Sequence, residues 1–302
     1  MRLTLVVNPT ASTVTPEARA HVEEALGAAH DLTVVETEKR DDATPLAATA
    51  AAEGAEVVVV LGGDGTYNEA ANGLLDTSTA LAVLPGGSTN VFARTIGLDN
   101  DVEAATGQVI DALSRGSRRR ISMGVANGRS FLFHCGVGFD AAVVEQVEKR
   151  GHLKRKIGQA VFVIATVATF RTYDRSRPPF SVRFPGEEPV DSYFALFLAS
   201  NPYTYLGKRR FNVAPDADFG RGLAALAFKD LRLSTLAGAA RAALGSGRKL
   251  EGRQSLERRA ELGTVSVTGH RPFRYQTDGD FLGTVDSLEL GHQPACLDLV
   301  VP

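Results

Sequence analysis

The sequence predicts an α/β domain with an open parallel sheet, followed by a β-rich domain whose sheet is mostly antiparallel. Three observations predict this fold class. Residues 1–125 alternate short β-rich segments with alanine-rich helical ones, and the unbroken apolar run at residues 57–61 is typical of a parallel strand covered on both faces. Strand-like segments dominate residues 126–289. The 302 residues, 44% of them apolar, are enough for two domains with cores of their own.

The predicted α/β domain begins with the apolar residues 3–7, which indicate a buried strand. Thr15 followed by Pro16 is typical of a helix N-terminus, because the hydroxyl accepts a backbone N–H and proline tolerates the first helical position. Val22 and Leu26 predict the buried face of that helix. The other expected elements are strands at residues 32–35, 57–61 and 81–84, a helix capped by Thr44 before Pro45, and a helix at residues 101–113.

The β-rich part is expected to contain more strands than helices. Its apolar and β-branched segments predict a mostly antiparallel sheet or sandwich. The strands are expected at residues 131–134, 180–184, 193–199, 224–228, 264–268 and 297–301, and the helices at residues 141–150, 154–173 and 234–244.

Composition excludes several classes of function. With 33 Lys and Arg against 35 Asp and Glu, the net charge is −2, so no global field attracts nucleic acid. Two cysteines are too few for a disulfide framework, and the six histidines lack metal-binding spacing, so no zinc site is expected. The N-terminus is a poor signal peptide, and the apolar run at residues 160–170 falls short of the ~20 residues that span a bilayer. We therefore expect a soluble, cytoplasmic protein.

A glycine-rich turn, Gly-Gly-Asp-Gly-Thr at residues 62–66, follows the strand at residues 57–61. Glycines let backbone N–H groups approach an anion, and the positive end of the next helix points at the same place. An aspartate among phosphates is repulsive without a divalent cation, so Asp64 predicts a nucleotide with Mg²⁺. As a loop-tip residue, Asp64 should contribute little to stability. A plain turn with a Thr66–Glu69 capping box is the alternative, although it leaves the three glycines unexplained.

A second turn, Pro-Gly-Gly-Ser-Thr-Asn at residues 85–90, follows the next strand. Taken alone it is also explained as a helix start with Ser88 or Thr89 as N-cap. Two such turns from neighbouring strands offer donors from several sides, which a triphosphate requires. The turns do not form a P-loop, because no Gly-Lys-Ser/Thr follows the glycines.

The order of these motifs resembles the diacylglycerol kinase catalytic-domain family of lipid kinases, which includes bacterial diacylglycerol kinases and sphingosine kinases. Besides the two turns, the resemblance rests on Asn8-Pro9, Thr37, Asn68-Glu69, Asn72-Gly73, residues 136–141, Ser200-Asn201-Pro202, Gly207, residues 215–217 and residues 277–280. It covers nearly the whole chain. It implies a Rossmann-like nucleotide domain at residues 1–125, joined by the C-terminal segment 290–302, and a β-sandwich lipid-substrate domain at residues 126–289.

The resemblance also implies an ATP and Mg²⁺ site in the first domain. Asp64 would be both a catalytic residue and the metal ligand. The residues implied to bind the nucleotide are Asn8, Thr37, Gly62, Gly63, Asp64, Gly65, Thr66, Glu69, Gly87, Ser88 and Asn90.

Asp280 is the second catalytic residue that the resemblance implies. It would stand in place of the family's glutamate as the general base, one methylene shorter. By themselves, residues 278–280 favour a plain β-turn between Tyr275 and Thr284, and only the resemblance implies a catalytic role. Asp140 is expected to cap the helix that follows it.

Three positions depart from the family pattern. Val91 removes a carboxylate, and Ser122 stands where bacterial members often have an acid. Arg221 occupies the position of an aspartate that holds a structural Mg²⁺ in many relatives, and a guanidinium cannot ligate a metal. We therefore expect that second metal site to be empty.

A lipid substrate requires contact with a bilayer. Five cations lie just before the apolar residues 157–170 and predict peripheral association with the inner membrane surface: Lys149, Arg150, Lys154, Arg155 and Lys156. A solvated helix end is the alternative for such a charge run. The sequence leaves open whether the chain forms a homodimer.

The leading hypothesis is an ATP-dependent lipid kinase that phosphorylates a hydroxyl of a diacylglycerol-like or sphingoid lipid. One alternative is a soluble-substrate kinase of the NAD kinase type, whose family shares a Gly-Gly-Asp-Gly turn. The other is a non-catalytic regulatory homologue that binds nucleotide or lipid, which the changes at Val91, Ser122 and Arg221 motivate.

Overall fold

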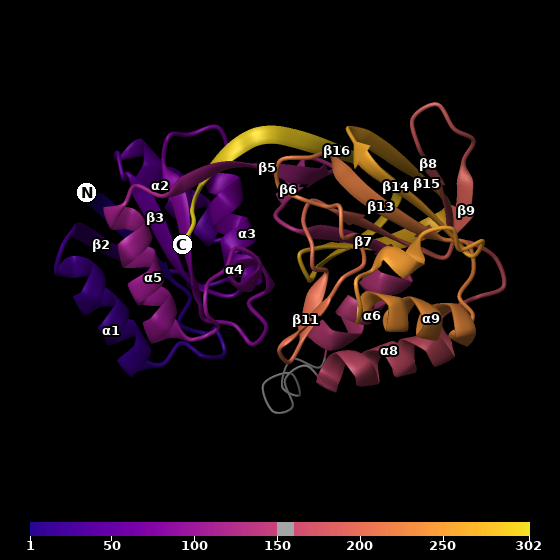
Figure 1. The fold of residues 1–302 in the computed structure, drawn as a ribbon, viewed down its shortest axis with the longest axis horizontal. Coiled ribbons are helices and arrows are strands. Elements are labelled where there is room, and N and C mark those ends of the chain that lie inside the picture. Colours follow the sequence, from indigo (N-terminus) through magenta and orange to yellow (C-terminus); the bar gives the residue numbers. More distant parts are fainter. Residues whose placement is uncertain (150–159) are drawn as a thin grey trace. The chain divides into compact units, whose positions relative to one another are not determined.

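The computed structural model describes residues 1–149 and 160–302, which divide into two compact units (Figure 1). Unit 1 contains Met1–Ser122 and Ala295–Pro302, and unit 2 contains Met123–Pro294. The chain passes between the units within two strands, β5 (Arg118–Ala126) and β16 (Asp280–Val300).

Unit 1 is built on a parallel sheet. The strand order is β16-β4-β3-β1-β2, and the C-terminal end of β16 joins β4 by a parallel pairing of Leu299 with Leu81. Every residue of β3 and β4 is buried, as the unbroken apolar runs predict. The other strands are β1 (Arg2–Val7), β2 (Asp31–Glu36), β3 (Val57–Gly62) and β4 (Ala80–Pro85).

The helices of unit 1 form two groups on the sheet. Helices α1 (Pro16–Gly27) and α5 (Val102–Ser114) pack against each other, and α2 (Ala43–Ala52) packs against α3 (Asp64–Gly73). A short helix, α4 (Val91–Thr95), follows β4. This arrangement confirms the predicted open α/β sheet.

Two predicted helix starts have different outcomes. Thr15 caps α1 as expected, since its hydroxyl accepts the N–H of Ala18 at 3.2 Å. The predicted cap at Thr44 is wrong, because α2 already begins at Ala43. The Thr44 hydroxyl instead donates to the carbonyl of Glu69 at 2.9 Å and so ties α2 to α3.

Unit 2 is β-rich and mostly antiparallel, which confirms the second half of the predicted fold class. Its strands pair in the order β14-β13-β10-β7-β15-β16, with β8, β9 and β6 attached at the side. They are β6 (Arg129–Phe131), β7 (His134–Gly138), β8 (Phe180–Arg183), β9 (Val190–Ser192), β10 (Phe194–Leu198), β13 (Leu223–Phe228), β14 (Leu256–Leu262) and β15 (Thr264–Thr277). A separate ribbon joins β11 (Thr204–Leu206) to β12 (Arg209–Phe211).

Side chains alternate between two hydrophobic clusters along the strands of unit 2, as a pleated strand requires. In β10, Phe194, Leu196 and Leu198 face one cluster, while Ala195 and Phe197 face the other. The first cluster lies under three helices, α6 (Phe139–Glu148), α8 (Ala160–Thr172) and α9 (Leu233–Ala243).

Two expectations about unit 2 need correction or restriction. The strand expected at residues 131–134 is broken between β6 and β7, because Asp278 accepts the backbone N–H groups at this point. The helix expected at residues 154–173 is described only from Ala160. Within the described ranges, no helix is long and apolar enough to cross a membrane.

Candidate functional site

The two glycine turns of unit 1 pack against each other, backbone to backbone. The N–H of Gly86 donates to the carbonyl of Gly62 at 2.6 Å. A Cβ on Gly86 would lie 2.6 Å from Val14 Cγ2 and 3.0 Å from the Gly62 backbone, and a Cβ on Gly87 would lie 3.0 Å from Gly63 Cα. Close packing therefore accounts for Gly86 and for Gly87, of which Gly87 is also one of the residues implied to bind the nucleotide.

Asp64 joins the two turns through its carboxylate. It is the first residue of α3, and its Oδ2 and Oδ1 accept the N–H groups of Val91 and Phe92, both at 2.9 Å. Asp64 therefore caps α4 and is not an isolated loop tip, so the reason given above for its small contribution to stability is wrong.

The predicted caps in the second turn are also wrong. Neither Ser88 nor Thr89 is the N-cap of α4, because Asn90 occupies that position in the left-handed region with φ 49°. The Asn90 side chain accepts the N–H of Gly87 and donates to its carbonyl, both at 2.8 Å. It thereby fixes the turn and leaves the capping of α4 to Asp64.

The N-terminus of α3 differs from that of α4. Its N-cap is Gly63, which has no side chain to cap the helix. The Thr66–Glu69 capping box is wrong: Thr66 Oγ1 accepts a hydrogen bond from Asn8 Nδ2 at 3.0 Å, and Glu69 Oε2 accepts the N–H of Ala43 at 3.2 Å. The N-cap residue of α3 thus leaves the first N–H groups of the helix to other acceptors, while Asp64 in the same turn adds a negative charge that an anion site here would need a cation to offset.

The structure brings most of the predicted nucleotide residues to one edge of the sheet. Asn8, Gly62, Gly63, Gly65, Thr66, Gly87, Ser88 and Asn90 lie at or just beyond the carboxyl ends of β1, β3 and β4. Thr37 follows β2 at the same edge, where its N–H donates to the carbonyl of Val7 at 2.9 Å. Glu69 is the exception, because its carboxylate is buried against the start of α2.

Tyr67 is a residue of this site that the sequence analysis missed. Its buried hydroxyl lies 2.8 Å from the carbonyl oxygens of Gly62 and Leu84, at the ends of β3 and β4. Burial, and to a smaller extent the charge of Asp64, raises the pKa of Tyr67 well above its usual value. The only signal in the sequence was a large aromatic residue directly after a glycine turn.

In unit 2, residues 277–280 form a two-residue hairpin turn. Thr277 pairs with Asp280 across β15 and β16, and both turn residues have positive φ, 50° at Asp278 and 88° at Gly279. The Asp278 side chain is buried, and its carboxylate accepts the N–H groups of Leu132, Phe133 and His134 at 2.6, 2.9 and 2.9 Å. Asp278 is therefore structural.

Asp280, the predicted base, begins β16 next to this buried anchor and is partly exposed. The neighbouring N–H of Phe281 donates to Glu148 Oε1 at 2.8 Å, which fixes the hairpin to the end of α6. The catalytic role of Asp280 stays a prediction.

A buried hydrogen-bond chain supports the same hairpin from the side of α6. Asp140 does not cap α6, contrary to expectation; its carboxylate accepts the Tyr203 hydroxyl at 2.6 Å and Gln276 Nε2 at 2.8 Å. Gln276 Oε1 in turn accepts the N–H of Gly279 at 2.9 Å. A Cβ on Gly136 would lie 1.7 Å from Asp140 Oδ2, so the glycine makes room for the carboxylate, and burial raises the pKa of Asp140.

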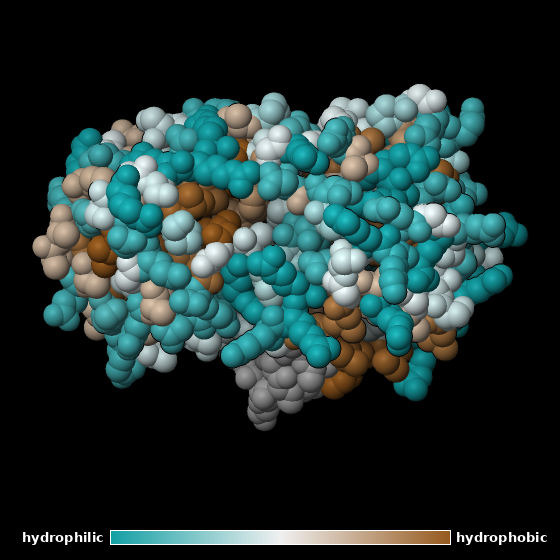
Figure 2. Space-filling model, in the orientation of Figure 1, coloured by the Kyte–Doolittle hydropathy of each residue, from teal (hydrophilic) through white to brown (hydrophobic). Residues whose placement is uncertain are grey.

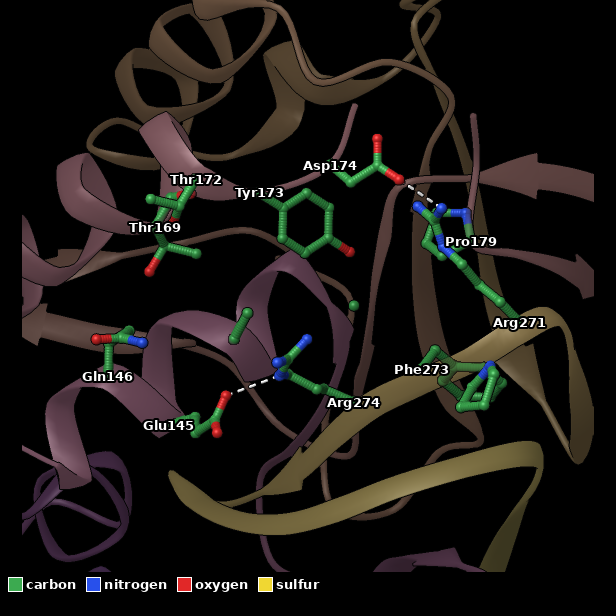
Figure 3. A pocket seen from close by; sticks show the side chains of 13 residues that line it. Glu145, Gln146, Thr169, Thr172, Tyr173, Asp174, Pro179, Arg271, Phe273 and Arg274 are labelled. Carbon is green, nitrogen blue, oxygen red and sulfur yellow. Dashed lines mark hydrogen bonds and ion pairs between the residues drawn. The ribbon is translucent and has the colours of Figure 1, made fainter. Parts of the chain in front are cut away.

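A pocket of about 410 Å³ lies beside α6 in unit 2 (Figure 3). Its lining comes from α6, from the C-terminal part of α8 and from β15. Two ion pairs stand in it, Glu145 with Arg274 at 2.7 Å and Asp174 with Arg271. The hydroxyl and backbone N–H of Ser176, and then the guanidinium of Arg271, lower the pKa of Asp174 to about 2. Such a pocket suits a small polar molecule with both donors and acceptors.

The three residues that depart from the family pattern each contact another part of the chain. Val91 is buried, and its backbone N–H donates to Asp64 Oδ2. Ser122 Oγ accepts the backbone N–H of Ala295 at 3.1 Å. Arg221 Nη1 lies 3.5 Å from Glu261 Oε1. The described part of the chain contains no group of three or more His, Cys, Asp or Glu that could hold a metal ion.

Of the predicted basic cluster, only Lys149 lies in the described residues, and its Nζ pairs with Glu145 at 2.7 Å. Arg150, Lys154, Arg155 and Lys156 lie outside the described residues.

Residues 2–126 match the family model of the diacylglycerol kinase catalytic domain. These residues belong to that family. A diacylglycerol kinase of Bacillus subtilis is 36% identical over 126 residues, which are 41% of this chain and 40% of that relative. A diacylglycerol kinase of Staphylococcus aureus is 31% identical over 138 residues, 43% of this chain and 42% of the relative. The matches thus span less than half the length of these diacylglycerol kinases.

The likeness in fold extends over the whole chain. A crystal structure of a diacylglycerol kinase from Bacillus anthracis, 18% identical, covers 100% of this chain and 97% of its own with a TM-score of 0.70. An NAD kinase from Archaeoglobus fulgidus in complex with ATP is 10% identical and matches with a TM-score of 0.51 over 99% of this chain and 93% of its own. At these identities both structures establish the fold alone.

Proposed function

We propose that the protein is an ATP-dependent lipid kinase that transfers the γ-phosphoryl group to a hydroxyl of a diacylglycerol-like or sphingoid lipid. The observation that carries this proposal is the N-terminus of α3, with Gly63 as its N-cap, beside the 85–90 turn, in a domain of the diacylglycerol kinase catalytic family. The names of the relatives support a lipid as acceptor, and the resemblance of Asp280 to the family's base supports an alcohol as nucleophile.

The residues at this edge of the sheet fit a triphosphate. Backbone N–H groups in the first turn of α3 would donate to phosphate oxygens, and Ser88 offers a hydroxyl from the second turn. Gly63 leaves the approach open, since a Cβ there would meet only the backbone of Gly87, at 3.5 Å or more.

Mg²⁺ fits this donor set in a limited way. Each Asp64 oxygen accepts one backbone N–H, which holds the carboxylate in a fixed orientation. Mg²⁺ commonly binds through one or two carboxylates together with phosphates and water, so a single anchored aspartate is compatible with it. When bound, the ion would supply charge neutralisation for the phosphates. Asp64 would orient it, because the two N–H bonds fix the carboxylate.

Asp280 would accept the proton of the attacking lipid hydroxyl. A general base must be held in one position relative to the hydroxyl. Three hydrogen bonds hold this hairpin: the N–H of Phe133 donates to Asp278, that of Gly279 to Gln276, and that of Phe281 to Glu148. The hydrogen bond from Tyr203 to Asp140 holds the carboxylate that accepts Gln276 Nε2, so it would affect only the position of the hairpin.

The pocket beside α6 is the proposed place for the polar groups of the acceptor. The same helix that lines it carries Glu148, one turn further on, at the hairpin of Asp280. Replacing Arg274 by Gln should raise the KM for the lipid and leave the KM for ATP unchanged. Equal changes in both constants would contradict this assignment.

The decisive experiment is incubation of the protein with γ-labelled ATP and a total lipid extract, with NAD in a parallel reaction. Label in a lipid product, dependent on a divalent cation, is the expected result. Label in NADP would replace the proposal by the soluble-substrate alternative, which the fold likeness to an ATP-bound NAD kinase keeps as the second candidate. ATP binding without transfer to any acceptor would favour the regulatory alternative.

A further inference from the structure

Helix α8 exposes a stripe of apolar side chains. Val163, Ile164 and Val167 are 61%, 47% and 45% exposed, while Val161 and Ala165 on the opposite side are fully buried in the cluster beneath. The three exposed residues lie at positions i, i+1 and i+4, which share one side of a helix. In Figure 2, hydrophobic side chains gather over the helices at this part of unit 2. We call Val163, Ile164 and Val167 the α8 stripe.

The stripe differs in charge from the surface of α1, which carries Glu17, Arg19, Glu23 and Glu24. Helix α8 has no acidic residue between Ala160 and Thr172, a feature that it shares with α2 and α9, but it groups three exposed apolar side chains on one side. A group of large apolar side chains left in water is typical of a surface that binds something, because covering it releases the cost of hydrating it.

Cations border the stripe at its C-terminal end. Arg171 lies in the last turn of α8, Arg175 places its guanidinium 4.2 Å from the centre of the Phe170 ring, and Arg177 follows. All three are exposed, and none forms an ion pair with another described residue. The acid between them, Asp174, is already neutralised by Arg271.

We propose that the α8 stripe docks on a bilayer that contains anionic lipid. The helix would lie in the plane of the interface, with Val163, Ile164 and Val167 among the acyl chains and the arginines at the level of the lipid phosphates. The proposal needs neither ATP nor an acceptor, so it goes beyond the proposed kinase activity and does not depend on it.

The test is co-sedimentation of the full chain with vesicles of phosphatidylglycerol and phosphatidylcholine, in the absence of ATP. Val163→Glu with Ile164→Glu should weaken binding about tenfold or more, because charges replace the inserted groups. The matched control adds the same two charges at exposed positions of β15, Thr264→Glu with Thr268→Glu, and should bind as the wild type does. Arg171→Gln with Arg175→Gln should weaken binding to these vesicles and lessen its dependence on salt.

Two readouts separate this proposal from others. Val163→Thr with Ile164→Thr makes the stripe more polar without adding charge and should also weaken binding, which distinguishes insertion from charge repulsion. Turnover of a short-chain, micelle-solubilised acceptor should not change in any stripe variant, so failure of the kinase proposal would be visible separately. Unchanged vesicle binding in both stripe variants would overturn the proposal. So would a wild-type dimer that becomes monomeric in the stripe variants while vesicle binding persists.

Discussion

Two aspartates in glycine turns, one in each unit, have similar surroundings and different consequences. Asp64 accepts two backbone N–H groups at the start of α4, and Asp278 accepts three in the break between β6 and β7. Asp278 is only 5% exposed and holds its hairpin from below. Asp64 stands at the first turn of α3, whose N-cap is Gly63.

The comparison teaches that an acid in a glycine turn satisfies backbone donors first. In unit 2 this makes Asp278 structural, and the anchored turn carries its neighbour Asp280, the proposed base. In unit 1 the anchored Asp64 ties the two turns together at the start of α3, where the phosphates are proposed to bind. Five measurements would break or sharpen this comparison.

The largest effect is expected at Asp280. Asp280→Asn should keep ATP affinity and lose about 10²–10⁴-fold of turnover, because an amide cannot accept the lipid proton. Single-turnover phosphoryl transfer beside ATP binding measures both. Asp280→Glu, which restores the family's residue, should retain partial activity. A folded Asp280→Asn protein with near-normal chemistry would remove this carboxylate from the mechanism.

Asp278→Ala should act on stability. Three buried N–H groups, those of Leu132, Phe133 and His134, would lose their acceptor, which should cost about 3 kcal/mol or more. Urea unfolding monitored by circular dichroism measures the loss. Asp286→Ala, on an exposed position of β16, is the matched control and should change stability by less than about 0.5 kcal/mol. Equal effects of the two substitutions would contradict the anchoring role.

Unit 2 should lose stability in mild acid because of His134. Burial lowers the pKa of this side chain to about 3, and its Nδ1 has no partner among the described residues. In the unfolded chain the imidazole takes a proton near pH 6.5, so stability falls as pH falls below that value. The loss between pH 6.5 and 5 should be about 1.5–2 kcal/mol.

His134→Phe should flatten this pH dependence, since a ring of similar size keeps the contact with Tyr203. The raised pKa of Asp140 has the opposite effect on stability, because just above the usual pKa of an aspartate the folded chain binds a proton that the unfolded chain does not. The quantity to measure is therefore the difference in pH dependence between His134→Phe and the wild type. Parallel curves for the two proteins would show that another group titrates.

Asp64→Asn should reduce stability by about 0.5–2 kcal/mol, the usual cost of losing a helix cap. An amide offers one acceptor oxygen for the two N–H groups of Val91 and Phe92. Differential scanning calorimetry should show a lower Tm for unit 1. Divalent-cation-dependent turnover should be lost in addition if the metal role is correct, whereas wild-type turnover would remove that role and leave only the cap.

The smallest effect on folding is expected at Gly63. Its backbone, with φ −105° and ψ 179°, accepts any residue, and a Cβ would make only an ordinary contact at 3.5 Å. Gly63→Ala should therefore change stability by less than about 1 kcal/mol. ATP affinity should fall, since the added methyl stands where the phosphates are proposed to approach. Gly86→Ala is the contrast, because it should unfold the packed turns.

Much of the fold could be predicted because it depends on local patterns. A few neighbouring side chains were enough to predict the Thr15 cap and the buried strands β3 and β4. They also predicted the change, after residue 125, from alternating strands and helices to mostly strands. The two glycine turns and the 277–280 hairpin were located for the same reason. Each of the two turns directly follows the end of a predicted strand in the sequence, and this predicted where it lies in the fold.

The partners of the polar side chains could not be predicted. Thr44, Thr66, Glu69 and Asp140 each have residue types and spacings typical of helix caps, yet each bonds to a residue distant in sequence. A cap competes with every other donor or acceptor that folding brings within reach, and sequence alone does not list these competitors. The tertiary contacts decided each case.

The sequence by itself determined the parallel sheet, the two turns at its edge and the acidic hairpin, because hydrophobic periodicity and glycine placement act over short stretches of chain. Only the tertiary structure decided that Asp64 caps α4, that Asp278 anchors a strand break, and that α8 leaves three apolar side chains in water. These depend on which groups remain unsatisfied after packing, and that is a property of the folded chain as a whole.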